Sequence, residues 1–201
     1  MKKLLSAILV FSSLSFLTAC DSGIAAQVGD TKISTNTVQN KIHEILSARA
    51  GVDTSQLQLS TGETLNRAEM RFLLISTVFE KIAAKYNLNI TQAMKDSKKS
   101  EIYSQVGGVD QLKSALISAE MAPSDFDTYI QSVLISDELI ARAKASGIAD
   151  ANTGAAIQQI VMEIAKTEKI KVNPQYGTWD ATNADLVAFD SAGTAVKIQT
   201  A

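Results

Sequence analysis

The sequence predicts a mostly α-helical fold: a multi-helix bundle with a small β element formed by strands from the two ends of the chain. Apolar residues make up 46% of the 201 residues and recur at helical spacing through the middle of the chain. Aromatic residues are only 5%, and there are only two prolines, a composition unlike that of a β-sandwich. Short strand-like segments lie near both ends, and pairing with each other is the simplest way to cover their edges.

The first nineteen residues predict a lipoprotein signal peptide that is removed before Cys20. Lys2 and Lys3 precede an uncharged apolar run over residues 4–17, which is too short for a lasting membrane span. The segment closes on Leu-Thr-Ala-Cys, which resembles the lipobox of bacterial lipoproteins, and Cys20 is the only cysteine of the chain. The alternative is a cytosolic protein whose N-terminal helix contains a buried cysteine.

Lipidation of Cys20 predicts a protein anchored at the extracytoplasmic face of the cell membrane, with the lipid bilayer as its first partner. Stable anchoring needs two or more acyl chains, each buried methylene contributing about 0.8 kcal/mol. Residues 20–24 then form a short lipidated lead, and residues 25–201 form a single domain. The formal net charge of −2 argues against a nucleic-acid partner, which would require a basic face.

The N-terminal part of this domain predicts two strands followed by a helix. The strands lie within residues 25–33 and are joined at a Gly-Asp turn. A helix capped by Ser34 or Thr35 follows and ends near Gly51. Val38, Ile42 and Ile45 are expected to form its inner face, with Arg49 as a further member of the same face.

The longest helix is predicted over residues 65–86, after a polar loop over residues 52–64. Apolar side chains cover most of its circumference, as in a helix at the centre of a bundle. The main stripe that we expect to face the core consists of Ala68, Phe72, Ile75, Phe79, Ile82 and Tyr86. The residues that widen this stripe are Leu73, Leu74 and Val78.

Four further helices are predicted before the chain becomes extended. They cover residues 91–106, 109–120, 123–145 and 152–168, with Thr91 as the cap of the first. The residues expected to point inward are Phe126, Ile130, Val133, Ile140, Ile157, Ile160, Val161 and Ile164.

The C-terminal part predicts β structure. Residues 169–180 read as extended, and residues 186–189 and 195–198 as two strands joined around residues 191–193. Tyr176 and Trp179 are expected to pack these strands onto the helices, with ligand stacking as the alternative.

The order of these segments resembles the N-terminal domain of the SurA, PrsA and trigger-factor type of chaperone. The strand pair with its Val-Gly-Asp turn, running into an amphipathic helix, is the first common segment. Residues 107–140, GGVDQLKSALISAEMAPSDFDTYIQSVLISDELI, resemble the characteristic helix pair of that domain. Residues 172–180, VNPQYGTWD, resemble the segment that closes the domain in lipoprotein members.

This resemblance implies an ATP-independent chaperone, or holdase, that binds unfolded or extended secreted polypeptides. Full-length members contain a parvulin-type isomerase domain before the closing segment, where this chain has only residues 147–170. We therefore expect no enzymatic activity and no cofactor. The alternative function is an accessory lipoprotein that docks on one specific envelope partner, without a groove for clients; a residual isomerase is a third reading.

No residue pattern predicts a catalytic or metal site. His43 is the only histidine, which excludes a multi-histidine zinc site and favours a polar helix flank. Asp125 and Asp127 point in different directions on a helix, so we interpret them as charges at a helix start. The basic residues near Lys98 are expected to form a solvated face, or else to contact anionic lipid or cell-wall polymer; they are Lys95, Lys98 and Lys99.

A peptide-binding groove would need adaptable apolar side chains. Methionine thioethers and aromatic rings suit varied partners. The candidates are Met70, Met94, Tyr103, Met121, Phe126 and Tyr129. Ordinary core packing is the alternative interpretation of all six.

Overall fold

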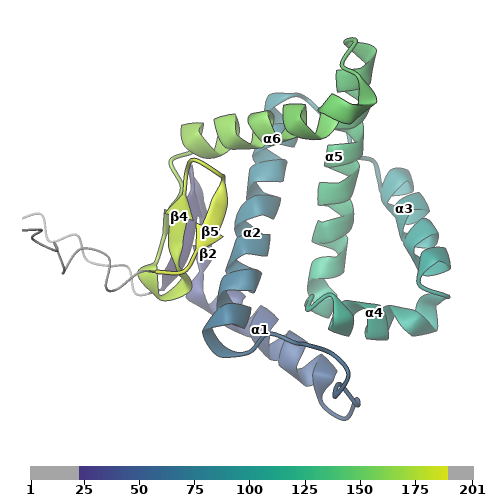
Figure 1. Cartoon of the computed structure of the whole chain (residues 1–201), viewed down its shortest axis with the longest axis vertical. Helices are drawn as coiled ribbons and strands as arrows, with labels where there is room; N and C mark the ends of the chain where they lie inside the picture. The colour runs from purple at the N-terminus through teal and green to yellow at the C-terminus, as the bar shows by residue number, and fades with distance from the viewer. Residues whose placement is uncertain (1–22, 190–201) are drawn as a thin grey trace, which may run out of the picture.

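The computed structural model describes residues 23–189, and these form six α-helices with two small antiparallel sheets (Figure 1). The predicted fold class is therefore confirmed. The signal peptide, Cys20 and the predicted strand at residues 195–198 lie outside the described residues.

The first sheet joins the two ends of the described chain. Its strands are β1 (Ile24–Val28), β2 (Thr31–Ser34) and β3 (Lys171–Val172), arranged in the order β2-β1-β3. The predicted hairpin turns at Gly29, whose φ of 61° lies in the left-handed region that glycine tolerates. Its backbone N–H donates to the carbonyl of Glu168 at 2.7 Å, so the turn also contacts the end of the last helix.

Two helices follow the hairpin, α1 (Thr35–Arg49) and α2 (Gly62–Lys85). The predicted cap of α1 is confirmed, because Ser34 Oγ accepts a hydrogen bond from the backbone N–H of Thr37 at 3.0 Å. The inner face of α1 is also as predicted, with Val38, Ile42 and Ile45 buried. Helix α2 begins three residues earlier than the sequence predicted.

The remaining helices are α3 (Gln92–Gln105), α4 (Leu112–Ser118), α5 (Phe126–Ala145) and α6 (Asp150–Thr167). Single 3₁₀ turns precede α4 and α5, at Val109–Gln111 and Pro123–Asp125, and a third covers Pro174–Tyr176. Figure 1 shows α2 and α5 side by side, with α6 across one end of both and α3 on the far side of α5.

The apolar interior of the described residues is divided into two clusters. The main core combines the first sheet with α1, α2 and α6, and includes Ile135 and Leu139 of α5. The second cluster lies between α3, α4 and the first half of α5, around Ile130 and Leu134. Helix α5 therefore belongs to both clusters, which fixes its position relative to α2.

The C-terminal part contains a strand pairing that the sequence analysis did not predict, while the predicted pairing with residues 195–198 lies outside the described residues. Strand β5 (Asp185–Val187) pairs with β4 (Thr178–Asp180), so the strand predicted at residues 186–189 begins one residue earlier, ends at Val187 and is the second strand of a hairpin. The missed signal is the turn between them, where the Asp180 carboxylate accepts hydrogen bonds from the Thr182 N–H and the Asn183 side chain. Tyr176 is buried and Trp179 packs against the main core, as the packing interpretation expected.

The predicted core stripe of α2 is wrong for its first three members. The buried apolar positions of α2 are Leu65, Met70, Leu74, Val78 and Ile82. Ala68 is exposed, Phe72 and Ile75 are half-buried, and neither hydrophobic cluster of the described residues includes any of these three. Both faces of α2 are apolar, so periodicity alone did not determine which of them would face the core.

The predicted solvated lysine face of α3 in fact lies against α5. Lys98 Nζ pairs with Asp137 at 3.1 Å and Lys99 Nζ with Asp127 at 2.6 Å. Lys95 donates a hydrogen bond to Gln131, also on α5. These cations connect two helices and are not available as an unpaired basic patch.

Candidate functional site: an apolar groove between α2 and α5

An open groove of about 360 Å³ separates α2 from the middle of α5. Its wall on α2 is the misassigned stripe, which places one apolar or small side chain on each successive turn. The residues that line it are Ala68, Arg71, Phe72, Ile75, Ser76, Phe79, Tyr129 and Ser132. Tyr129 of α5 faces this stripe and is 37% exposed, which is high for so large an apolar side chain. The groove is therefore a concave apolar surface that the described chain leaves uncovered.

Both walls of this groove are held by well-packed side chains behind them. On α2, Leu74 and Val78 are fully buried in the main core and do not line the groove. On α5, Ile130 and Ile135 are fully buried in the second cluster and the main core respectively. Because interiors packed in this way resist deformation, the groove is preformed and does not need a partner to open it.

An exposed ion pair lies at one end of the groove. Arg71 Nε lies 2.5 Å from Asp185 Oδ1 of β5, and this pair links α2 to the C-terminal hairpin. The arginine is therefore neutralised at the groove edge. The polar lining residues Ser76 and Ser132 are small, and Ser132 already donates its hydroxyl to the Thr128 carbonyl at 3.0 Å. The groove thus offers shape and apolar area but few directional contacts.

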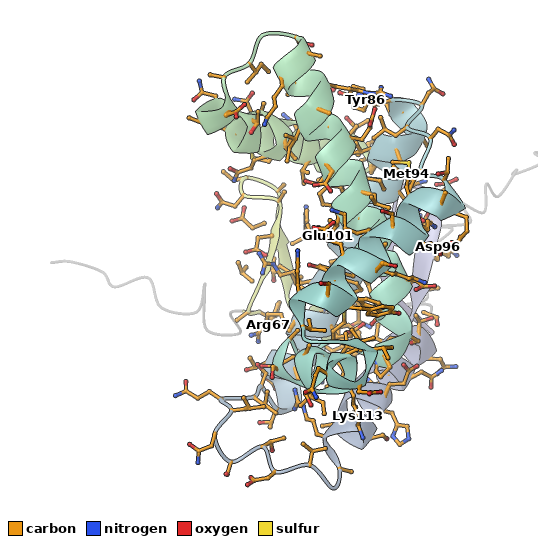
Figure 2. The ribbon with its side chains drawn as sticks, turned by 90° about the vertical axis from the view of Figure 1, so that its right-hand side faces the viewer. Arg67, Tyr86, Met94, Asp96, Glu101 and Lys113 are labelled. Atoms are coloured by element: carbon orange, nitrogen blue, oxygen red, sulfur yellow. The ribbon has the colours of Figure 1, made fainter. Side chains whose placement is uncertain are left out.

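A second open groove, of about 580 Å³, lies between α1 and α4. It combines apolar side chains with charges of both signs at its edges, and Val109 on its wall is 62% exposed. The lining residues are Glu44, Ser47, Ala48, Val109, Leu112, Lys113, Leu116 and Pro123. Figure 2 shows Lys113 on α4 at the lower end of the molecule, away from Tyr86. This surface is larger than the α2–α5 groove, and its lining contains two charged side chains where that of the α2–α5 groove contains one.

Of the six predicted peptide-binding residues, the structure brings only Tyr129 to the α2–α5 groove. Met70 is fully buried in the main core, and Phe126 is buried in the second cluster, stacked on Tyr103 with ring centroids 6.0 Å apart. For Met70 and Phe126 the ordinary-core interpretation is correct. Met94 and Met121 are half-buried against the second cluster, and Met94 also lines a shallow hollow with Glu101 (Figure 2).

The structure brings two carboxyl groups together that the sequence analysis did not connect. Glu69 of α2 is 3% exposed and Asp125, just before α5, is 1% exposed, while Lys41 Nζ of α1 lies 2.6 Å from Asp125 Oδ1. Burial, then the charge of Asp125 and a hydrogen bond with it, raise the pKa of Glu69 to about 8. At neutral pH Glu69 is therefore mostly protonated, and the pair has one proton and one ammonium group for two carboxyls.

This carboxyl pair is sealed from solvent, so it has a structural role where α1, α2 and α5 meet. Asp127, the other predicted helix-start charge, is exposed and pairs with Lys99. His43 is exposed on α1 beside Ser47, as the polar-flank interpretation expected. Among residues 23–189, no three acidic, histidine or cysteine side chains are grouped in a way that could bind a metal ion.

Comparisons with known proteins give no relative for this chain. No protein family matches it, and neither a characterised protein nor a solved structure shows significant similarity. Within residues 23–189, no helix has both the length and the apolar character that crossing a bilayer requires.

Proposed function

We propose that the protein is a lipid-anchored extracytoplasmic holdase that binds apolar segments of unfolded or extended polypeptides without ATP. The observation that carries this proposal is the α2 stripe, whose Phe72 and Ile75 line a preformed groove and pack into neither hydrophobic cluster. The lipobox-like sequence ending at Cys20 supports the location, since it would hold the groove close to the site where secreted chains emerge.

The dimensions of the groove suit a short extended segment. From Ala68 to Phe79, α2 rises by about 16 Å at 1.5 Å per residue. An extended strand of about five residues covers the same length at 3.3 Å per residue. Such a segment would bury apolar side chains against Phe72, Ile75 and Tyr129.

The chemistry of the groove favours weak binding of many sequences. Burial of apolar surface is non-directional and contributes roughly 25 cal/mol per Å², so any segment with apolar side chains of suitable size gains affinity. The single charged group in the lining, Arg71, is already paired with Asp185. This combination gives little sequence selection and allows release, both of which a holdase requires.

A docking function on one envelope partner is the second candidate, and the α1–α4 groove favours it. Glu44 and Lys113 place opposite charges at its edges, and charged rims of this kind fix the orientation of a specific partner. A single partner of complementary charge would therefore bind at Val109 and Leu112 rather than at Ile75.

Two matched variants separate these functions in the mature chain from residue 20 with Cys20→Ser, which contains every residue of the described fold. We expect this protein to slow the aggregation of an unfolded client, measured by light scattering. Ile75→Asp should remove most of this effect because it puts a charge in the α2–α5 groove, while Val109→Asp should retain it. Circular dichroism checks that both variants fold.

Two outcomes would contradict the proposal, the first its function and the second its binding site. One is that the Cys20→Ser protein, folded and at molar excess, does not slow aggregation at all. The other is that Val109→Asp removes the effect and Ile75→Asp does not, which would assign binding to the α1–α4 groove.

A further inference from the structure

The described chain ends near the first turns of α2, just before the residues of α2 that line the α2–α5 groove. Ala188 and Phe189, at the end of the described residues, line a hollow together with Glu63 and Arg67 of the first turns of α2. Figure 2 shows Arg67 near the base of the C-terminal strand pair. One turn further along α2, Arg71 pairs with Asp185 of β5 and also lines the groove. The end of β5 and the start of the groove therefore share one region of α2.

The sequence that follows has the composition and length to enter this groove. Residues 190–201 read DSAGTAVKIQTA, with a strand-like apolar segment at residues 195–198. In an extended segment Val196 and Ile198 lie on one face and Lys197 on the other, because side chains alternate. The residues between Phe189 and Val196 span up to about 20 Å, at roughly 3.3 Å each. This reach exceeds the length of about 16 Å that α2 presents to the groove.

We propose that residues 195–198 occupy the α2–α5 groove in the client-free protein, with Val196 and Ile198 against Phe72, Ile75 and Tyr129. As a regulator of client binding, this contact depends on the function proposed above. A tethered segment has an effective concentration in the millimolar range, so even weak intramolecular binding competes with a client at micromolar concentration. The tail would then keep the apolar groove covered until a client with larger side chains displaces it.

The absence of a second cysteine makes this contact directly testable in the mature chain with Cys20→Ser. Ser132→Cys combined with Val196→Cys should form an intramolecular disulfide under mild oxidation, because Ser132 lines the groove on α5. The matched control is Val109→Cys with Val196→Cys, which places the thiol in the α1–α4 groove. Mass spectrometry of the monomer and non-reducing electrophoresis measure the yields.

The binding consequence is measured with the same chain and a fluorescent extended peptide that contains two valines and a leucine. Val196→Asp with Ile198→Asp should tighten peptide binding about tenfold, because the tail no longer competes. A matched variant, Thr194→Asp, adds charge next to the apolar segment without removing its side chains and should leave the affinity within twofold.

The outcomes distinguish this proposal from the holdase function. Equal disulfide yields in the two cysteine pairs, or unchanged peptide affinity in the double aspartate variant, would overturn the tail contact while leaving the holdase function standing. A covalent dimer as the main product would assign the groove to a second copy of the chain and also overturn it. A selective intramolecular disulfide without peptide binding by any variant would keep the contact and reject the holdase function.

Discussion

Helix α2 has two apolar faces that look alike in sequence and differ completely in environment. On one face Met70, Leu74 and Val78 are fully buried against the sheet, α1 and α6. On the other, Phe72 and Ile75 line an open groove opposite Tyr129. A surface helix normally has one apolar stripe, so a second stripe that no element within residues 23–189 covers is unusual. The comparison teaches that the apolar circumference of α2 exceeds what this fold buries, and the excess is the candidate binding site.

The largest expected difference between the two faces is in stability, and it is tested by truncating one residue on each face. Leu74→Ala removes a fully buried side chain and leaves a cavity, so we expect it to lower the free energy of unfolding by about 2–5 kcal/mol. Ile75→Ala shortens a side chain that already borders open space, so we expect a loss below about 1.5 kcal/mol. Urea unfolding followed by circular dichroism measures both.

The informative quantity is the ratio of the two decreases in the free energy of unfolding, since both variants shorten a branched apolar side chain of the same size to alanine. Similar losses for Leu74→Ala and Ile75→Ala would mean that the groove face is buried in solution. If the additional loss disappears when Val196→Asp and Ile198→Asp are present, the tail is the element that buries it.

Helix α2 also contains a buried carboxyl group, Glu69, which makes the stability of the protein depend on pH. The folded-state pKa of Glu69, about 8, is far above its ordinary value of 4.5. Between these values the folded protein retains a proton that the unfolded chain releases, so stability falls as pH rises. The slope approaches about 1.4 kcal/mol per pH unit within this window and vanishes above the folded pKa.

Glu69→Gln should remove this slope, because an amide stays neutral and can still donate a hydrogen bond to Asp125. When the pH is raised from 6 to 7, we expect the free energy of unfolding of Glu69→Gln to increase by about 1 kcal/mol relative to that of the wild type. Urea unfolding at each pH measures this difference. Glu80→Gln, on the exposed side of the same helix, is the matched control and should leave the slope unchanged. A slope that persists in Glu69→Gln would show that another group retains the proton.

The two faces of α2 also show which features of the fold can be predicted from the sequence and which cannot. Local signals were sufficient where one residue determines the geometry, as at the Gly29 turn, the Ser34 cap and the glycine stops after α3 and α5. They were insufficient where a choice depends on which distant element packs on a face. Phe72 and Leu74 are both good core candidates, and only the position of the sheet and α6 separates them.

The same limit applies to the charged residues. Asp125 sits at a helix start, as its position suggested, but nothing local indicates that Lys41 and Glu69, which are far away in the sequence, surround it. Likewise, the α3 lysines have the spacing of a solvated face, and only the tertiary contact with α5 pairs them. Candidate-site residues chosen by side-chain type alone therefore included Met70, which is core, and omitted Phe72, which lines the groove.

The smallest expected effect concerns how the second wall of the groove is held. Lys98 lies between Glu101, at 2.9 Å, and Asp137 of α5, at 3.1 Å, and hydrogen bonds to these two carboxylates raise its pKa. Both acids are half exposed, and ion pairs near solvent contribute little, so Lys98→Ala should lower the free energy of unfolding by less than about 1 kcal/mol. The apolar second cluster, with Ile130 and Leu134, would then be what fixes α5 opposite Phe72 and Ile75.

Client binding by Lys98→Ala should accordingly match that of the parent protein in the aggregation assay. Weakened binding at unchanged stability would instead mean that the ion pairs set the width of the groove, and raising the salt concentration should then weaken binding by the parent protein in the same way.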